Sequence, residues 1–317
     1  MAEQASYPLS GGGSKPTPPI QELVRIIAKA RFEANPDMCF QGIIRQVWTE
    51  VDPCPKLKFD GTERVEEISR EDAESLIVRY EWLGTVGRGI EAFYGLRLHG
   101  ELVGACAFGR MGGQVGNICG PELAEQTVCL HRGCCTHFAP DLAASFLISH
   151  ACRQARLDHK WRIYFAYSDA AAGERGVVYK AAGWFFLGQD LGRAKGSFHV
   201  DFISPDGKEK LSSYAINHDS QRDYKRLRKL GWDESKGRIR PFLRDIGWKP
   251  VKVFGKRKWV HFAGTRAERA ELKSLCRYKP QPPPEDPERK PLGSDAGDQA
   301  YPAGSLCWEH KGGSKCG

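Results

Sequence analysis

One stretch, residues 161–188, constrains the fold of this chain more than any other. Residues 163–167 are apolar and aromatic, with the length and β-rich composition of a strand. Asp169 supplies turn chemistry after that strand, and Gly173 marks a short polar loop. Gly183 ends a short helix that follows the loop. The stretch is typical of strand, loop, short helix and second strand, at residues 163–167, 168–176, 177–182 and 184–187.

The segments before this stretch predict an α/β protein with a mixed sheet flanked by helices. Ser69, followed three residues later by Asp72, marks a helix start, and His99-Gly100 marks a hairpin. The expected order is strand, helix, hairpin, strand, loop, helix, strand, helix, strand. These elements are predicted at residues 65–68, 70–80, 93–98, 102–110, 122–130, 131–140, 141–156, 163–167, 177–182 and 184–187.

This order is that of the GNAT acyltransferase superfamily, and the residues themselves narrow the resemblance. The distinctive set is Tyr167, Ser168, Asp169, Gly173, Gly176, Val178, Tyr179, Ala181, Trp184 and Gly188. With this set, the chain resembles the phage Mom family over residues 65–188. Those proteins modify adenine in DNA by adding a carbamoylmethyl group at N6. The resemblance therefore implies a GNAT-like transferase, encoded by a phage, that protects phage DNA from host restriction.

Asp169 and Tyr179 are the first candidate catalytic residues. Asp169 ends a strand at the sheet rim, where ligands bind in α/β folds. It can act there as a metal ligand, a general base or an acceptor for an amine, although an Asp in this position also serves as an N-cap or Asx-turn residue. In the GNAT superfamily a tyrosine on the short helix lies beside the cofactor thiol, which implies a pocket position for Tyr179. A core tyrosine is the alternative.

A second candidate site is the segment of residues 129–137, which is rich in cysteine and histidine. GNAT enzymes bind the pyrophosphate of coenzyme A here through backbone amides, so Arg132 and Gly133 are expected to contact a cofactor, an acyl-CoA-like donor. The segment has no Gly-x-Gly run, and its cysteines fit a buried core as well as a metal site. Ser145 is a further catalytic candidate, because Arg132-Gly133 and Ser145 match the Mom family's loop and helix start.

Glu81 completes the predicted catalytic set, at the turn that faces the substrate in GNAT folds. The Mom family often has His-Tyr where this chain has Glu81-Trp82. That histidine is a proposed iron ligand in the family, so the resemblance implies an iron site that includes Asp169. Glu81, which can also bind iron, or His137 would then take the place of the histidine. The alternative for Glu81 is a solvated glutamate at a helix end.

Basic residues concentrate in the last third of the chain. Residues 205–280 hold 21 Lys and Arg against 9 Asp and Glu, whereas the remainder is mildly acidic. A basic segment attached to a near-neutral domain indicates a polyanionic partner, here double-stranded DNA. The residues expected to contact phosphates are Arg222, Lys225, Arg226, Lys256, Arg257 and Lys258.

These patterns divide the chain into five predicted parts. They are a disordered tail (1–19), an N-terminal helical extension and linker (20–61), a Mom-like catalytic domain (62–203), a basic DNA-binding extension (204–280) and a disordered Pro/Gly-rich tail (281–317).

Cysteine usage and hydropathy predict the compartment. The chain has 11 cysteines, and it shows neither a secretory signal nor an apolar run long enough to span a bilayer. These features predict reduced thiols in the cytoplasm of a bacterial host cell. Two other functions stay open at this point. One is an N-acetyltransferase acting on a protein or small amine, and the other is a non-catalytic DNA-binding protein.

Overall fold

The computed structural model describes residues 19–87, 89–110, 116–189, 199–207, 209–212, 216, 224–253 and 255–283. The helical elements are α1 (Ile20–Ala34), α2 (Phe40–Val51), α3 (Arg70–Tyr80), η2 (Pro121–Gln126), α4 (Ala143–His159), η3 (Ala170–Ala172), α5 (Val177–Ala181), α7 (Tyr224–Lys229), η5 (Glu234–Lys236), α8 (Ile239–Asp245) and α9 (Arg266–Leu275). The strands are β1 (Arg64–Glu67), β2 (Ile90–Leu98), β3 (Glu101–Gly109), β4 (Thr127–Cys135), β5 (Ile163–Ser168), β6 (Phe185–Gln189), β7 (His199–Ile203), β8 (Lys210–Leu211), β9 (Lys249–Val253) and β10 (Arg257–Phe262).

A seven-stranded mixed sheet forms the body of the molecule, in the order β1-β2-β3-β4-β5-β10-β6. Strands β4 and β5 run parallel, and the other neighbouring pairs are antiparallel. The chain passes from β1 through α3, the β2–β3 hairpin, β4, α4, β5 and α5 to β6 in the expected order. The predicted GNAT-like mixed sheet flanked by helices is therefore confirmed.

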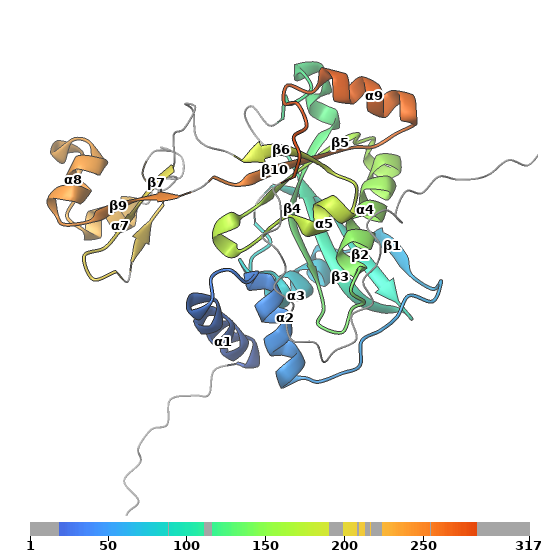
Figure 1. Ribbon diagram of the computed structural model, residues 1–317, viewed down its shortest axis with the longest axis horizontal. Coiled ribbons are helices and arrows are strands. Elements are labelled where there is room, and N and C mark those ends of the chain that lie inside the picture. Colours follow the sequence, from blue (N-terminus) through green and yellow to red (C-terminus); the bar gives the residue numbers. More distant parts are fainter. Residues whose placement is uncertain are drawn as a thin grey trace, which may run out of the picture.

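Helices cover both faces of this sheet (Figure 1). On one face α4 and α5 pack over a core that includes Tyr94, Phe108 and Tyr164. On the other face α1, α2 and α3 cover the β2–β4 half, where Ile77 and Phe93 are buried. Helix α9 covers the β5–β10–β6 half of that second face.

Strand β4 differs from its predicted position at residues 122–130. Pro121 occupies the first position of η2, so residues 121–126 form a 3-10 turn and the strand begins only at Thr127. Strand β3 then supplies partners as far as Cys135, with His131 bulged out between neighbouring pairs. Residues 131–135, which fall in the loop expected at residues 131–140, are thus part of the strand.

The expected boundary after residue 203 is wrong in the structure. Strand β10, residues 257–262, inserts between β5 and β6 of the main sheet, although it comes from the segment predicted to be a separate extension. The chain between β6 and β10 leaves the sheet and builds a second, three-stranded sheet, β8-β7-β9, which α7 and α8 accompany. We call residues 199–253 the inserted lobe.

Several predictions concern residues outside the described part of the chain. They include most of both tails and Arg222, and their predicted disorder and DNA contact remain predictions. Within the described residues, no helix has the length and apolar character needed to cross a membrane.

Candidate functional site

The candidate site lies where β4 and β5 stop pairing with each other. Their parallel ladder ends at the Leu130–Ala166 pair. Beyond it, β4 continues along β3 to Cys135, whereas β5 continues along β10 to Ser168. The bulge at His131 marks the point where β4 turns away, as bulges commonly do beside functional sites. The residues at this divergence come from the end of α3, from β4, from the loop after β5 and from the start of β10.

Asp169 follows the last residue of β5, and its carboxylate has two interactions. Its Oδ1 accepts a hydrogen bond from the Ala171 backbone N–H at 2.9 Å, which caps η3. Its Oδ2 lies 3.9 Å from Nζ of Lys256, at the entry to β10, and about one fifth of its side chain is exposed. The turn-forming role is therefore present, and one carboxylate oxygen faces a cation at the divergence.

Tyr179 lies in the middle of α5 and is fixed by two tryptophans. Its ring stacks on Trp259 with centroids 5.6 Å apart and contacts Trp184 at 5.3 Å. Its hydroxyl lies 3.4 Å from the Tyr167 carbonyl oxygen, at the end of β5. Burial raises the pKa of Tyr179 above its usual value, so the hydroxyl stays protonated at neutral pH. This side chain is a proton or hydrogen-bond donor rather than a base.

Glu81 is buried, which contradicts the alternative of a solvated glutamate. Only 4% of the residue is exposed. Its Oε2 accepts hydrogen bonds from the backbone N–H groups of Leu83 (2.7 Å) and Gly84 (3.1 Å) and lies 3.9 Å from Nε of Arg132. Burial raises the pKa of Glu81, and the positive charge of Arg132 opposes that rise. Arg132 also donates to the Thr85 carbonyl, so it ties β4 to the turn after α3.

Glu174 joins this group, although the sequence analysis did not single it out. Its Oε2 accepts a hydrogen bond from the Asp169 backbone N–H at 2.7 Å, and the Trp82 side chain bonds to the same carboxyl. Burial, together with the negative charges of Asp169 and Glu81, raises the pKa of Glu174 to about 7. The signal that could have found it is a second acidic residue in the same glycine-bounded loop as Asp169.

The N-terminal helices form part of the site's surroundings. A Cβ on Gly173 would lie 2.1 Å from the Met38 carbonyl oxygen, so the loop after β5 sits directly on the α1–α2 turn. Gln41 of α2 donates to the Gly133 carbonyl at 2.8 Å, and the Phe40 ring contacts that of Trp82 at 6.4 Å. Residues 20–61 are therefore packed against the seven-stranded sheet rather than attached to it as a free extension.

Two predicted site residues have other partners. The His137 ring is buried, with Nδ1 2.9 Å from the Tyr80 hydroxyl and Nε2 2.8 Å from the Asp52 carbonyl oxygen. It joins α3 to the segment after α2. Ser145 donates its hydroxyl to the Leu142 carbonyl at 3.0 Å, within the start of its own helix. No contact in the described structure joins either residue to Asp169.

The described His, Cys, Asp and Glu side chains do not assemble into a metal centre. Among the described residues, no group of three or more His, Cys, Asp or Glu side chains is placed to hold a metal ion. Cys129, Cys134 and Cys135 are buried, and burial raises their thiol pKa values, which is the behaviour of core cysteines. The iron implied by the resemblance therefore stays a prediction, and no step below depends on it.

The basic triplet of Lys256, Arg257 and Lys258 stands at the entry to β10, with the Lys256 side chain exposed. Lys256 faces Asp169, and Arg257 donates to the Glu174 carbonyl oxygen at 3.2 Å. The Lys258 ammonium lies 5.2 Å from the centre of the Tyr278 ring. These residues were expected to form a separate phosphate clamp, but two of them instead border the candidate site, because β10 is a strand of the main sheet.

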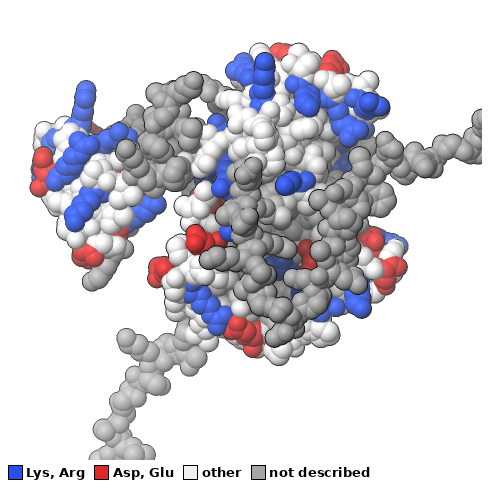
Figure 2. Space-filling model, in the orientation of Figure 1, with Lys and Arg blue, Asp and Glu red and all other residues white. Residues whose placement is uncertain are grey.

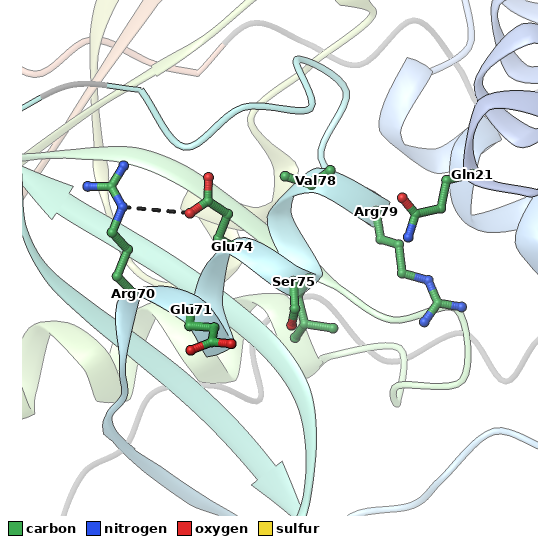
Figure 3. A pocket seen from close by; sticks show the side chains of 8 residues that line it. Gln21, Arg70, Glu71, Glu74, Ser75, Val78 and Arg79 are labelled. Atoms are coloured by element: carbon green, nitrogen blue, oxygen red, sulfur yellow. Dashed lines mark ion pairs between the residues drawn. The ribbon is translucent and has the colours of Figure 1, made fainter. Parts of the chain in front are cut away.

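A shallow groove elsewhere on the surface involves none of the predicted site residues (Figure 3). It runs along α3 and is closed on one side by Gln21 of α1. Arg70 and Glu74, one helical turn apart, form an ion pair there at 3.7 Å. Charge pairs of this exposed kind contribute little and do not define a site.

Comparison with known proteins adds a family and several distant structures. Residues 62–239 match the Mom protein family. No match was found among the curated proteins. Similar solved structures include an acetyltransferase from Bacillus subtilis in complex with CoA (9% identity, 64% of this chain, 100% of that chain, TM-score 0.32) and a probable acetyltransferase from Staphylococcus epidermidis (11%, 64%, 100%, 0.33). Scores this low support no further inference, and the fold assignment rests on the strand order.

Proposed function

Because the chain belongs to the Mom protein family, we propose that it is a DNA-modifying transferase that adds a carbamoylmethyl-type group to N6 of adenine. The observation that carries the proposal is the gathering of Asp169, Tyr179, Glu81 and Arg132 around the β4–β5 divergence. The modified base would protect a phage genome from restriction in the cytoplasm of the bacterial host.

Asp169 is the proposed acceptor for the adenine amine. The amine lies at the major-groove edge of the base pair, but the reaction at N6 requires that the base be extruded, at a cost of a few kcal/mol. The N6 lone pair then forms a bond to the electrophilic carbon of an activated carbamoylmethyl donor, and the leaving group departs with the electron pair of the broken bond. The proton released from N6 passes to the Asp169 carboxylate.

Tyr179 and the neighbouring cations support the same step. The Tyr179 hydroxyl, which burial keeps protonated, donates a hydrogen bond toward the leaving group. Nζ of Lys256 lies 3.9 Å from Oδ2 of Asp169, so a positive charge stands beside the carboxylate that takes the proton. Arg132 and the backbone at Gly133 would face the donor. An acyl thioester would transfer its carbonyl carbon, so the carbamoylmethyl product requires an activated donor whose leaving group stands on the CH2 carbon.

The test is nucleoside mass spectrometry of DNA from cells that express the protein. Wild-type protein is expected to yield modified deoxyadenosine. Asp169→Asn, which keeps side-chain size and turn preference, should reduce the yield at least about a hundredfold, the usual contribution of a positioned acid or base. Glu71→Gln, an exposed carboxyl on the outer side of α3, is the matched control and should change nothing.

Two outcomes favour the alternatives. Acyl-CoA binding without affinity for DNA, and acetylation of a protein or small amine, would favour an ordinary N-acetyltransferase. DNA binding without any modified nucleoside would favour a non-catalytic DNA-binding protein. Near wild-type modification by Asp169→Asn would instead remove Asp169 from the reaction while leaving the family assignment unchanged.

A further inference from the structure

The inserted lobe is a folding unit with its own core. Phe202 of β7, Leu227 of α7, Leu243 of α8 and Trp248 are all buried in one cluster that contains no residue of the main sheet. Figure 1 shows the lobe beside the body, with β7, β9, α7 and α8 together. A unit of this kind is not needed to complete the seven-stranded sheet, so its function has to be sought on its surface.

Both ends of the lobe join the body at the candidate site. The chain leaves the main sheet after Gln189 and re-enters it at Arg257, and these two residues are paired partners in β6 and β10. Arg257 is also paired with Ser168, the residue before Asp169. From Val253, the last residue of β9, to Arg257 there are four Cα steps, a reach of at most about 15 Å. The lobe is therefore tethered close to Asp169.

The outer surfaces of the two lobe helices are basic. In α7, Lys225 and Lys229 lie one turn apart on the exposed side, while Leu227 faces the core. In α8, Arg240 and Arg244 have the same spacing, while Leu243 is buried. Figure 2 shows Lys and Arg spread over the visible face of the lobe. Among the described residues of the lobe, the exposed basic ones are Lys210, Lys225, Arg228, Lys229, Lys236, Arg238, Arg240, Arg244 and Lys249.

Most of these cations have no acidic partner in the described part of the chain. Arg226, by contrast, pairs with Glu209 at 2.9 Å, and Lys210 pairs with Asp201 at 2.8 Å. Like charges four residues apart, as in Arg240 and Arg244, repel each other and destabilise a helix. The repulsion between these charges decreases when a polyanion lies across the helices and neutralises several of them together.

We propose that the inserted lobe holds duplex DNA by its phosphates, through the exposed arginines of α8 and the lysines of α7, and so presents the duplex beside Asp169. The inference rests on the proposed function for the choice of duplex DNA as the polyanion. In this proposal most phosphate contacts are made by the lobe and not by the basic triplet at the start of β10, whose side chains contact Asp169, Glu174 and Tyr278. Phosphate contacts of this kind position a duplex without reading its sequence.

The experiment compares two triple variants of the full-length protein. The lobe variant carries Arg238→Ala, Arg240→Ala and Arg244→Ala. The matched control carries Lys29→Ala, Arg64→Ala and Arg70→Ala, which remove the same charge from exposed positions on the body. Fluorescence anisotropy measures binding of a labelled DNA duplex between about 50 and 200 mM salt. Circular dichroism confirms that each variant is folded, and single Arg240→Ala and Arg244→Ala variants replace the triple one if it is not.

The lobe variant should bind at least about tenfold more weakly, and its log–log salt dependence should be shallower by about 2 to 3, since each lost phosphate contact removes about 0.9. The control should bind like the wild type. An unchanged affinity and slope in the folded lobe variant, or tighter binding to duplex RNA or to an acidic protein than to DNA, would overturn the proposal. Failure to find modified adenine in cells would overturn the proposed function and leave this binding result standing.

Discussion

Glu174→Gln offers a direct test of how the site is built. The carboxyl accepts from the Asp169 backbone N–H and is shielded from solvent between that loop and Trp82. Its pKa is raised from 4.5 to about 7, so the folded protein keeps a proton that the unfolded chain releases at lower pH. This contribution to stability is fully present below pH 4.5 and is lost as the pH rises through 7.

The size of this loss of stability follows from the difference in the pKa of Glu174 between the folded and the unfolded chain. A change of roughly 2.5 pKa units corresponds to about 3 kcal/mol in the free energy of unfolding. Glutamine stays neutral throughout, so the stability of the wild type relative to Glu174→Gln should fall by about this amount between pH 4.5 and 7 and stay level above. Taking the difference between the two proteins cancels the titration of the other carboxyls.

Urea denaturation followed by tryptophan fluorescence is a suitable assay, because the chain contains 8 tryptophans. It would be run for wild type, Glu174→Gln and the exposed control Glu71→Gln at intervals across this pH range. Parallel stability curves for wild type and Glu174→Gln would refute the reasoning, since they would mean that Glu174 titrates alike in the folded and unfolded chains.

Two further predictions concern the elements that hold the site. A Cβ on Gly176 would lie 2.2 Å from the Trp259 ring, at a backbone φ of +78°. At Gly183 the backbone φ is similar, +74°, but a Cβ would have no atom within 4 Å. Gly176→Ala should therefore lower the melting temperature clearly more than Gly183→Ala. Equal decreases in melting temperature for the two variants would show that the structure around Trp259 accommodates the added Cβ. Arg25→Ala should lower the free energy of unfolding, measured by urea denaturation, by about 2 kcal/mol, because the Arg25 guanidinium donates to three carbonyls at the end of α3. A loss below about 0.5 kcal/mol would show that Arg25 does not stabilise the end of this helix.

Local signals in the sequence were reliable wherever neighbouring residues decide the structure. Ser69 accepts a hydrogen bond from the Asp72 N–H, as the spacing of these two residues predicted. The His99-Gly100 hairpin also formed, with both residues at positive φ. In each case the hydrogen bonds or dihedral angles that fix the element lie within a few residues of sequence, so a short pattern is enough to predict them.

The pairing of strands that are distant in the sequence could not be predicted from such short patterns. Strand β10 pairs with β5, about 90 residues earlier, and with β6, and no short pattern in residues 257–262 indicates either partner. The burial of Glu81 was missed for a similar reason. The turn that carries it is covered by Arg25 and by β4, both distant in sequence, and base rates for a glutamate at a helix end carry no information about such neighbours.

The N-terminal helices show why the site is larger than the part of the chain that matches the family. Residues 62–239 match the Mom protein family, yet Arg25 of α1 donates to the Val78 carbonyl at 2.6 Å and to the Glu81 carbonyl at 2.8 Å. These bonds fix the end of α3 and hence the turn that places Glu81 against Arg132. Gly173 meanwhile allows the loop that carries Asp169 to rest on the α1–α2 turn. Both sides of the β4–β5 divergence are thus held by helices that precede the matched segment, so the geometry of Asp169 and Glu81 depends on residues 20–51 as much as on the sheet.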